Sequence, residues 1–383
     1  MFHQRASLRL VAASFGVVQH QWMTESAAEP GPTTGSMTNL PQSSQDVTAH
    51  ETGLSFKRDP KLTYASSCVL PTSWMPCKLL RVLPYNHDTS IFEFEVPGGG
   101  PLKLPTCSCL LLKAPGREHS WKGGGDAVRP YTPISKEGME DRFQLLIKRY
   151  QEWGTKPTEN EGYAIHRSYR PPGAVSNYLH ELQPGVDHVE FKHIPANVKL
   201  QYPFVGVKRI TMIAVGVGIA PMVQALEKIL ETPGDKTEVV LLYGNRSIRD
   251  ILLREKLDEW SRVHGHRFKV VYAVGSRWAN VHFGMKKAAK QGFSTSIDDL
   301  KQPPVAKGFE SLEVSASQAK ELGWVDESAI RRHGFSPSDE TRVFVCGLPG
   351  VYDKLCGPRT ERGLPADSAL ARLGFQEGDV VKF

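Results

Sequence analysis

The chain has 383 residues, enough for two domains of ordinary size with extensions. Hydrophobic residues make up 40% and charged residues 23%, as in ordinary soluble proteins, and a formal net charge of +6 is too small to indicate nucleic-acid binding. Six cysteines without a C-x-x-C pair fit neither a disulfide scaffold nor a structural zinc or iron–sulfur site, so no metal is predicted.

The N-terminal segment, residues 1–23, contains Arg5 and Arg9, carries no acidic residue and places several apolar side chains on one helical face. This composition predicts a mitochondrial presequence, with a membrane-associating helix or a disordered start as alternatives. The cytoplasm and the endoplasmic-reticulum surface are therefore alternative locations. The apolar run Leu8–Val18 is too short to span a bilayer. Residues 24–69 are rich in Ser, Thr, Pro, Gly and Ala and are predicted to form a disordered linker.

Short strands are predicted across residues 70–205. Cys77–Val82 and Ile91–Val96 have the pattern of successive strands, with a turn at His87-Asp88-Thr89 between them, and Cys109–Lys113 is another candidate. Glycine and proline punctuate these segments. The first half of the ordered chain is therefore predicted to be a small antiparallel β-barrel.

The heptad Arg129–Ser135, R-P-Y-T-P-I-S, is the most informative stretch. Its two prolines remove backbone donors and favour an extended run at a sheet edge. In such a run Arg129 and Tyr131 share one face while Thr132 points to the other. A guanidinium, an aromatic ring and a hydroxyl suit an aromatic cofactor that carries a diphosphate. A surface loop with an incidental arginine is the alternative.

A strand is predicted next, over Phe143–Tyr150. Alternate residues beginning with Phe143 face inward, whereas Leu146, Lys148 and Tyr150 line the opposite face and are placed to lie along the same ligand.

A helix start follows at Gly173. Val175, Leu179 and Leu182 fall at helical spacing, Gly173 permits a tight approach, and Ser176 is a candidate cap. The N-terminus of this helix is expected to seat a phosphate group.

The second half, residues 206–383, has a different pattern. Arg209–Val215 is a continuous apolar strand, as in a buried parallel sheet, and is followed by Gly216-Val217-Gly218-Ile219-Ala220-Pro221 and a helix. Further strands are predicted at Val239–Tyr243, Phe268–Val274 and Arg342–Cys346, with helical patterns around Asp250–Trp260 and Val351–Leu355. This alternation predicts a doubly wound α/β domain with a parallel sheet.

Residues 279–321 are expected to form an insertion, most simply a surface loop. A basic group at Lys286, Lys287 and Lys290 makes partner docking the alternative.

Three motifs in order resemble the FAD domain of the ferredoxin–NADP reductase superfamily, and most closely the NADH–cytochrome b5 reductase family. They are R-x-Y-[ST]-x-x-S at Arg129–Ser135, I-K-x-Y at Ile147–Tyr150 and G-x-x-S at Gly173–Ser176. The turn Cys346–Gly350 is similar to the family's C-G-P-P-x. The family often has glycine and threonine where this chain has Val215 and Val217, and the loss of a hydroxyl at 217 bears on cofactor positioning.

The resemblance implies two sets of binding residues. The expected FAD ligands are Arg129, Pro130, Tyr131, Thr132, Ser135, Leu146, Lys148, Tyr150, Gly173, Val175 and Ser176. The expected nucleotide ligands are Gly216, Gly218, Ala220, Pro221, Asp250, Cys346, Gly347 and Pro349. Thr132, Lys148 and Cys346 are expected to be catalytic. Asp250 would repel a 2′-phosphate and favour NADH, although Arg246 and Arg249 leave NADPH as the alternative.

The implied activity is hydride transfer from NADH to FAD, followed by single-electron transfer to a separate acceptor. No H-P-G-G motif of a fused haem domain occurs, so the expected partner is cytochrome b5 or a similar small acidic haem protein. A monomer without a transmembrane span is expected, with peripheral membrane association as an option. The alternatives are reduction of a quinone or ferredoxin, or a flavoprotein scaffold with little turnover.

Overall fold

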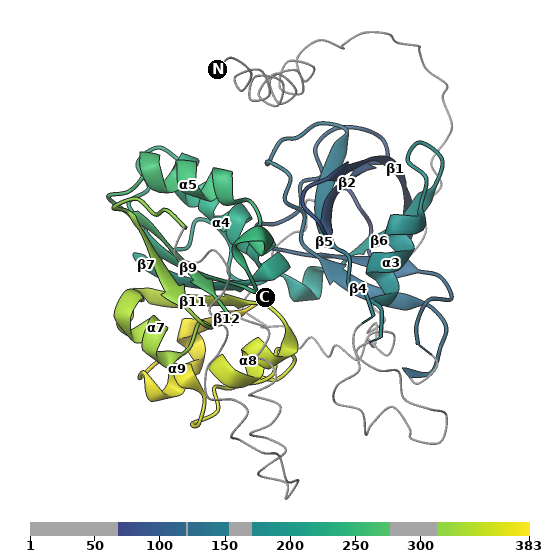
Figure 1. The fold of residues 1–383 in the computed structure, drawn as a ribbon. Coiled ribbons are helices and arrows are strands. Elements are labelled where there is room, and N and C mark those ends of the chain that lie inside the picture. The colour runs from purple at the N-terminus through teal and green to yellow at the C-terminus, as the bar shows by residue number, and fades with distance from the viewer. Residues whose placement is uncertain (1–67, 120–121, 153–170, 276–311) are drawn as a thin grey trace, which may run out of the picture. The chain divides into compact units, whose positions relative to one another are not determined.

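The computed structural model describes residues 68–119, 122–152, 171–275 and 312–383 (Figure 1). The predicted presequence at 1–23 lies outside these residues, as does nearly all of the predicted linker.

The first domain is an antiparallel sheet of six strands among the described residues. These strands are β1 (Met75–Pro84), β2 (Thr89–Glu95), β3 (Leu110–Ala114), β4 (Ala127–Tyr131), β5 (Arg142–Lys148) and β6 (His188–His193). They are ordered β4-β3-β6-β1-β2-β5. The two outer strands meet just beyond β4, because Ile134 donates its amide to the carbonyl of Gln144 at 2.8 Å. The sheet therefore curls on itself, as the predicted antiparallel barrel requires (Figure 1).

The inside of this barrel is filled by large apolar side chains. Phe143, Leu145 and Ile147 are fully buried, which confirms the inward face predicted for β5. The helix α3 (Ala174–Glu181) adds Val175 and Leu179 to the same core. Each such side chain contributes about 1.5–3 kcal/mol by leaving water, so this core is what holds the barrel together.

The second domain is a parallel sheet with strand order β10-β9-β8-β7-β11-β12. Its strands are β7 (Arg209–Val215), β8 (Glu238–Asn245), β9 (Phe268–Val274), β10 (Gln318–Leu322), β11 (Thr341–Cys346) and β12 (Val380–Lys382). Its helices are α4 (Ile219–Glu231), α5 (Arg254–Val263), α7 (Glu327–His333), α8 (Pro349–Leu355) and α9 (Ala369–Arg372). This confirms the predicted α/β domain with a parallel sheet.

Helices cover both faces of the parallel sheet (Figure 1). Met212 and Leu241 pack in one core with α4 and α5, whereas Ile213 and Leu242 pack in another with α7, α8 and α9. Because side chains alternate along a strand, strands covered on both faces must be apolar throughout. Ile210–Val215 is apolar, apart from Thr211, for this reason.

Two predictions about segments are corrected. The expected loop at 279–321 ends in a strand, since Gln318–Leu322 form β10 and pair in parallel with β9. Residues 279–311, with the three lysines of the basic group, lie outside the described residues. The helical pattern predicted from Asp250 begins later. Asp250 ends the short turn η4 (Ile248–Asp250), and α5 starts at Arg254 after Leu253 adopts a left-handed conformation with φ of 55°.

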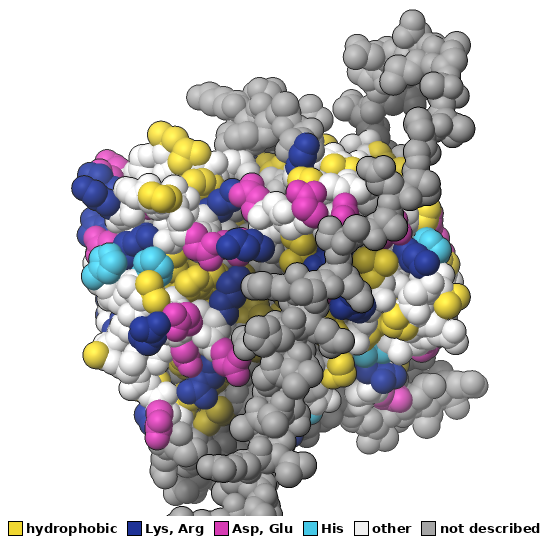
Figure 2. All heavy atoms as spheres, turned by 90° about the horizontal axis from the view of Figure 1, so that it is seen from above, with side chains coloured by type: hydrophobic (Ala, Val, Ile, Leu, Met, Phe, Trp, Pro, Cys, Tyr) yellow, Lys and Arg dark blue, Asp and Glu magenta, His cyan; other side chains and the backbone are white. Residues whose placement is uncertain are grey.

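The described residues contain no candidate membrane span, and the face drawn in Figure 2 does not carry charge of a single sign. Among the described residues no helix combines the length and the apolar character needed to cross a bilayer. Basic and acidic side chains are interspersed over the face seen in Figure 2. This mixture agrees with the small net charge.

Candidate functional site

The order in which strands are added to the parallel sheet reverses at β7, whose neighbours are β8 and β11. Ligands of open α/β sheets bind in the crevice at such a switch point, beyond the carboxyl ends of the strands. Two turns lie there: η3 (Gly216–Gly218) after β7, and Cys346–Pro349 between β11 and α8. The predicted nucleotide motifs are thus brought together from opposite ends of the domain.

Gly218 is required where these two turns touch. A Cβ atom at this position would lie 2.3 Å from the carbonyl oxygen of Cys346 and 3.0 Å from the amide nitrogen of Gly347. The glycine was predicted to be a nucleotide ligand. In the structure it first lets the backbones of two turns approach each other.

Gly216 has a different requirement. Its φ of +56° lies in the left-handed region that glycine tolerates best. Its carbonyl accepts a hydrogen bond from the hydroxyl of Tyr243 at 3.1 Å, and that hydroxyl accepts one from the amide of Leu252 at 3.2 Å. Tyr243 is fully buried and fixes the shape of the turn. Sequence reasoning treated Tyr243 only as a strand residue.

Val215 fills the space between two neighbouring glycines. The positions of a Cβ on Gly244 and on Gly347 each lie 3.2 Å from its side chain. Val215 is 9% exposed, so it packs within the sheet edge, and the departure from the family pattern at this position is a matter of packing.

Cys346 lies at the end of β11 beside the C-terminus. Tyr352 accepts a hydrogen bond from the amide of Gly347 and donates one to the carbonyl of Phe383. Phe383 in turn donates its amide to Val345 at 2.9 Å. Burial raises the pKa of the Cys346 thiol to about 11, partly offset by its hydrogen bond with Tyr352. The thiol is therefore neutral at pH 7 and serves as a small polar contact.

Alkylation of Cys346 is expected to be slow at pH 7 and to accelerate steadily toward pH 11. The thiolate is the reactive form, and its fraction grows about tenfold per pH unit below the pKa. Iodoacetamide labelling followed by peptide mass spectrometry measures the rate at this cysteine. A rate that levels off near pH 8 would mean that the thiol is not held neutral.

The barrel domain offers a second close approach, at the start of α3. A Cβ on Gly173 would lie 2.5 Å from the Ser176 hydroxyl and 3.0 Å from the Cβ of Tyr150. Gly173 donates its amide to the carbonyl of Tyr150 at 2.8 Å, and Tyr150 donates its amide to the Ser176 hydroxyl at 3.3 Å. The end of the I-K-x-Y segment is thereby joined to the helix.

Ser176 was predicted to cap α3, but it does not. The N-cap residue is Gly173, and Ser176 donates its hydroxyl to the Gly173 carbonyl from inside the first turn. No side chain among the described residues caps this helix. First-turn amides without a side-chain cap can bind an anion, and the phosphate seat at this helix stays a prediction.

Arg129 is on β4, an edge strand as predicted, with Pro130 opposite Leu111 of β3. Its guanidinium donates to Glu118 at 2.7 Å and to the carbonyl of Val128 at 2.8 Å. Two of its roughly five N–H donors are used in this way, which leaves others for a diphosphate. Glu118 was not identified from the sequence, because it lies in a loop without a recognisable pattern.

The two domains meet at Lys148. Its ammonium lies 2.7 Å from Asp88 of the barrel domain and 3.0 Å from Asp250 of the α/β domain. Arg246 also contacts both carboxylates, at 2.9 Å and 2.6 Å. His87 lies 3.5 Å from Asp88. The motif residues Lys148 and Asp250 are thus in direct contact. From the sequence, Asp88 was predicted only as part of a turn, and Arg246 only as a possible ligand of a 2′-phosphate.

Asp250 is ionised throughout the working pH range. Burial alone would raise its pKa, but hydrogen bonds from Arg246, Ser247 and Lys148 outweigh burial and hold the pKa well below its usual value. A depressed carboxylate pKa means that the unfolded state binds the proton more tightly. The stabilisation is therefore complete above the unfolded pKa near 4 and is lost as the pH falls below it.

Asp250→Asn is expected to flatten the acid side of the stability profile. The wild-type free energy of unfolding should fall faster between about pH 4 and pH 2.5 than that of the variant, because only the wild type must protonate this carboxylate on unfolding. Urea titrations at several pH values measure this difference. Parallel profiles would show that Asp250 does not have a depressed pKa.

The remaining predicted residues lie around these contacts. Thr132 directly follows β4 and is half-buried. Leu146 was predicted to face the ligand but is only 4% exposed and packs into the core shared with the α/β domain. Ala220 and Pro221 are buried in the first turn of α4, and the Pro221 carbonyl accepts a hydrogen bond from the Cys107 thiol at 3.1 Å.

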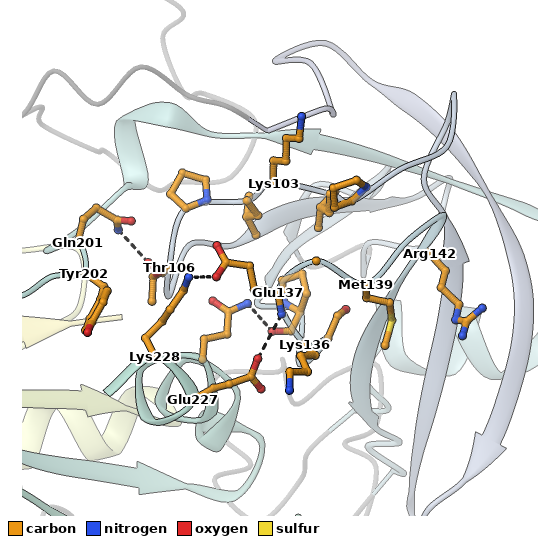
Figure 3. Close-up of a pocket in the computed structure, with 18 residues that line it drawn as sticks. Lys103, Thr106, Lys136, Glu137, Met139, Arg142, Gln201, Tyr202, Glu227 and Lys228 are labelled. Carbon is orange, nitrogen blue, oxygen red and sulfur yellow. Dashed lines mark hydrogen bonds and ion pairs between the residues drawn. The ribbon is translucent and has the colours of Figure 1, made fainter. Parts of the chain in front are cut away.

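Ser135 lies elsewhere. Its hydroxyl accepts the amide of Gln144 at 2.6 Å, and it lines a pocket of about 540 Å³ between the 101–106 loop, the 133–139 turn and α4 (Figure 3). There the ionic groups pair with one another: Glu137 with Lys228, and its amide with Glu227. Of the residues predicted to bind cofactor, only Ser135 lines this pocket. The switch point, where η3 packs against β5 and Lys148 of β5 contacts Asp250, is therefore the better candidate site.

The motif residues of the barrel domain and of the switch point fit FAD and a nicotinamide dinucleotide. The donor set comprises uncapped helix amides at α3, spare guanidinium donors on Arg129 and the two glycine turns. Asn245, at the carboxyl end of β8, is 7% exposed; its amide lies near Tyr243 but makes no hydrogen bond of normal geometry within the described residues. A buried amide in this state calls for a ligand partner.

Comparison with known proteins agrees with this arrangement. The family described as "Oxidoreductase FAD-binding domain" matches residues 76–197, and "Oxidoreductase NAD-binding domain" matches residues 212–301. The cytochrome b5 reductase domain of Ulva prolifera nitrate reductase has a TM-score of 0.57 at 24% identity, covering 82% of this chain and 98% of that domain. The CS-b5R domains of human Ncb5or have a TM-score of 0.52 at 18% identity, covering 81% and 69%. Fold and site together define a flavoprotein oxidoreductase that uses FAD and NADH.

The sequence relatives specify the family. A protein named NADH-cytochrome b5 reductase 2 from Mycosarcoma maydis is 30% identical over 309 residues, which cover 80% of this chain and 71% of that protein. Its namesake from Yarrowia lipolytica is 31% identical over 317 residues, covering 81% and 86%. The chain belongs to the NADH–cytochrome b5 reductase family and is an enzyme of that type.

Proposed function

We propose that this enzyme takes electrons from NADH into FAD and passes them singly to a small haem protein of the cytochrome b5 type. When bound, FAD accepts two electrons together from the nicotinamide and releases them one at a time, as a haem acceptor requires. The contact between Lys148 and Asp250, at 3.0 Å, carries the proposal. It joins the I-K-x-Y segment of the barrel domain to the turn η4 after β8 of the α/β domain, which supports transfer between a flavin and a dinucleotide bound by these segments.

The barrel domain supplies the flavin site. The amides in the first turn of α3 and the spare donors of Arg129 hold the diphosphate, because charge-assisted hydrogen bonds favour an anion there. Ser176 supports them from behind by joining Gly173 to Tyr150. Tyr131 and Thr132 lie at the end of β4, where they can contact the ring system.

The α/β domain supplies the hydride donor's site. The turns at Gly216–Gly218 and Cys346–Pro349 bring backbone close to the dinucleotide, and the neutral Cys346 thiol orients the nicotinamide ring. Lys148 offers a positive charge to the dinucleotide at the junction of the domains. These residues position both reactants and exclude water, which is the main contribution a protein makes to transfer between two cofactors.

Two measurements test the proposed function. Adding NADH to the oxygen-free, FAD-loaded enzyme should bleach the flavin absorbance; an unchanged spectrum would support a scaffold role and overturn the proposal. Steady-state turnover should then be highest with cytochrome b5 in a panel that includes a quinone and a ferredoxin. The relatives' name and the small positive charge of this chain both support that choice of acceptor.

We also propose that the protein is a mitochondrial monomer. Arg5, Arg9 and the lack of acidic residues in the first 23 positions support the location. Import into isolated mitochondria with removal of the N-terminal segment tests it, and light scattering tests the oligomeric state.

A further inference from the structure

Arg246 is shared between the two domains. One of its terminal nitrogens, Nη2, lies 2.6 Å from Oδ1 of Asp250 and 2.9 Å from Oδ2 of Asp88. Asp88 belongs to the turn between β1 and β2 in the barrel domain, whereas Arg246 and Asp250 follow β8 in the α/β domain. The barrel domain thus holds a guanidinium directly after β8, the second strand of the α/β domain, where dinucleotide-binding sheets usually contact the adenosine ribose.

Asp250 retains limited capacity for a ligand. Its Oδ1 accepts hydrogen bonds from Arg246 and from Lys148, and its Oδ2 accepts one from the Ser247 hydroxyl at 2.7 Å. A carboxylate has about four acceptor positions, so about one remains, on Oδ2. That is enough for one ribose hydroxyl.

The cluster is balanced in charge only because Asp88 is part of it. Lys148 and Arg246 are positive, Asp88 and Asp250 are negative, and His87 lies beside both carboxylates at 3.5 Å and 3.8 Å. Without the Asp88 carboxylate, two cations would face one anion. The Arg246 side chain is 44% exposed, so a guanidinium released from Asp88 has room to turn outward toward solvent.

We infer that Asp88 is a positioning residue that sets the choice between NADH and NADPH through Arg246. By holding the guanidinium against Asp250 and cancelling its charge, Asp88 keeps Arg246 from binding a 2′-phosphate. An arginine placed near the adenosine ribose is the usual means of accepting that phosphate. The nucleotide preference of this chain is therefore set in part by a residue of the barrel domain. The inference rests on the proposed use of NADH at this site.

The test compares two nucleotide fragments that bind without electron transfer. Calorimetric titration of the FAD-loaded Asp88→Asn variant should show about tenfold tighter binding of adenosine 2′,5′-bisphosphate, with 5′-AMP affinity changed by less than about twofold. Asp88→Glu, which keeps the carboxylate, should discriminate between the two fragments as the wild type does. In turnover, kcat/KM for NADPH relative to NADH should rise through KM, with kcat changed less.

A double-mutant cycle with Arg246→Gln isolates the route. In that background Asp88→Asn should give no gain in bisphosphate affinity, because the group that Asp88 restrains is gone. An equal gain in both backgrounds would overturn the inference by showing a general charge effect. A proportional loss of both fragments' affinities in Asp88→Asn would also overturn it, since Asp88 would then act as a structural residue.

Glu259→Gln is the matched control. Glu259 forms an exposed pair with Arg262 on α5 at 2.7 Å, so its substitution removes one negative charge, as Asp88→Asn does, but from a helix surface of the α/β domain. Both fragment affinities should stay unchanged. Failure of the proposed function is separately visible, as the absence of flavin bleaching by NADH in the unaltered protein.

Discussion

Gly218→Ala is expected to lower the rate of flavin reduction by NADH by at least about 100-fold and to destabilise the α/β domain by about 2–3 kcal/mol. The added methyl group would lie 2.3 Å from the oxygen and 2.7 Å from the carbon of the Cys346 carbonyl. Both are backbone atoms, which cannot rotate out of the way. The turns that form the nucleotide crevice would have to separate.

Three measurements define this effect. Stopped-flow absorbance gives the reduction rate, thermal unfolding gives the stability, and the flavin content should be unchanged because the barrel domain is not altered. Gly350→Ala is the control, since no atom of the described residues lies within 4 Å of its Cβ position and alanine is preferred over glycine in a helix such as α8. Normal flavin reduction by Gly218→Ala would show that the two turns are not in contact in solution.

Lys148→Met is expected to reduce kcat/KM for NADH by about 100-fold and stability by about 2 kcal/mol. The Lys148 side chain is 10% exposed and lies between two carboxylates that are themselves largely buried. Removing the ammonium leaves Arg246 facing both Asp88 and Asp250, so the crevice gains net negative charge. An anionic dinucleotide should then bind less well.

Lys256→Met separates the two parts of this effect. Lys256 pairs at 3.1 Å with Glu227, a carboxylate that is also largely buried, but this pair lies on α4 and α5 away from the crevice. Its loss should lower stability without changing kcat/KM. Lys148→Arg should keep most of the NADH activity at low salt. Equal kinetic effects of the two methionine variants would remove Lys148 from the nucleotide site.

Much of the fold could be predicted because its causes are local. Phe143, Leu145 and Ile147 alternate along β5, and the largely apolar run of β7 indicated a strand covered on both faces. The strand β10 was missed because Gln318–Leu322 is polar and half-exposed, so it carries neither pattern. It forms only because β9 offers a partner edge.

The candidate site could be predicted only as separate pieces. The motifs around Arg129, Lys148, Gly173, Gly218 and Cys346 identified the residues, but the role of Ser176 was wrong because capping depends on where the helix begins. Gln224 was missed as well. It accepts the amide of Cys107 at 2.6 Å and donates to the carbonyl of Pro133 at 2.7 Å, which joins the domains.

The amino-acid sequence alone determined the two domains, several of their strands and the chemistry of the cofactor motifs, because periodicity, glycine and proline act over a few residues. Only the tertiary structure decided that position 218 must be glycine because it lies against the Cys346 carbonyl, and that Arg246 binds both Asp88 and Asp250. These contacts join residues up to 158 positions apart. Residues so far apart in the sequence can interact only after folding has brought their side chains within hydrogen-bonding distance.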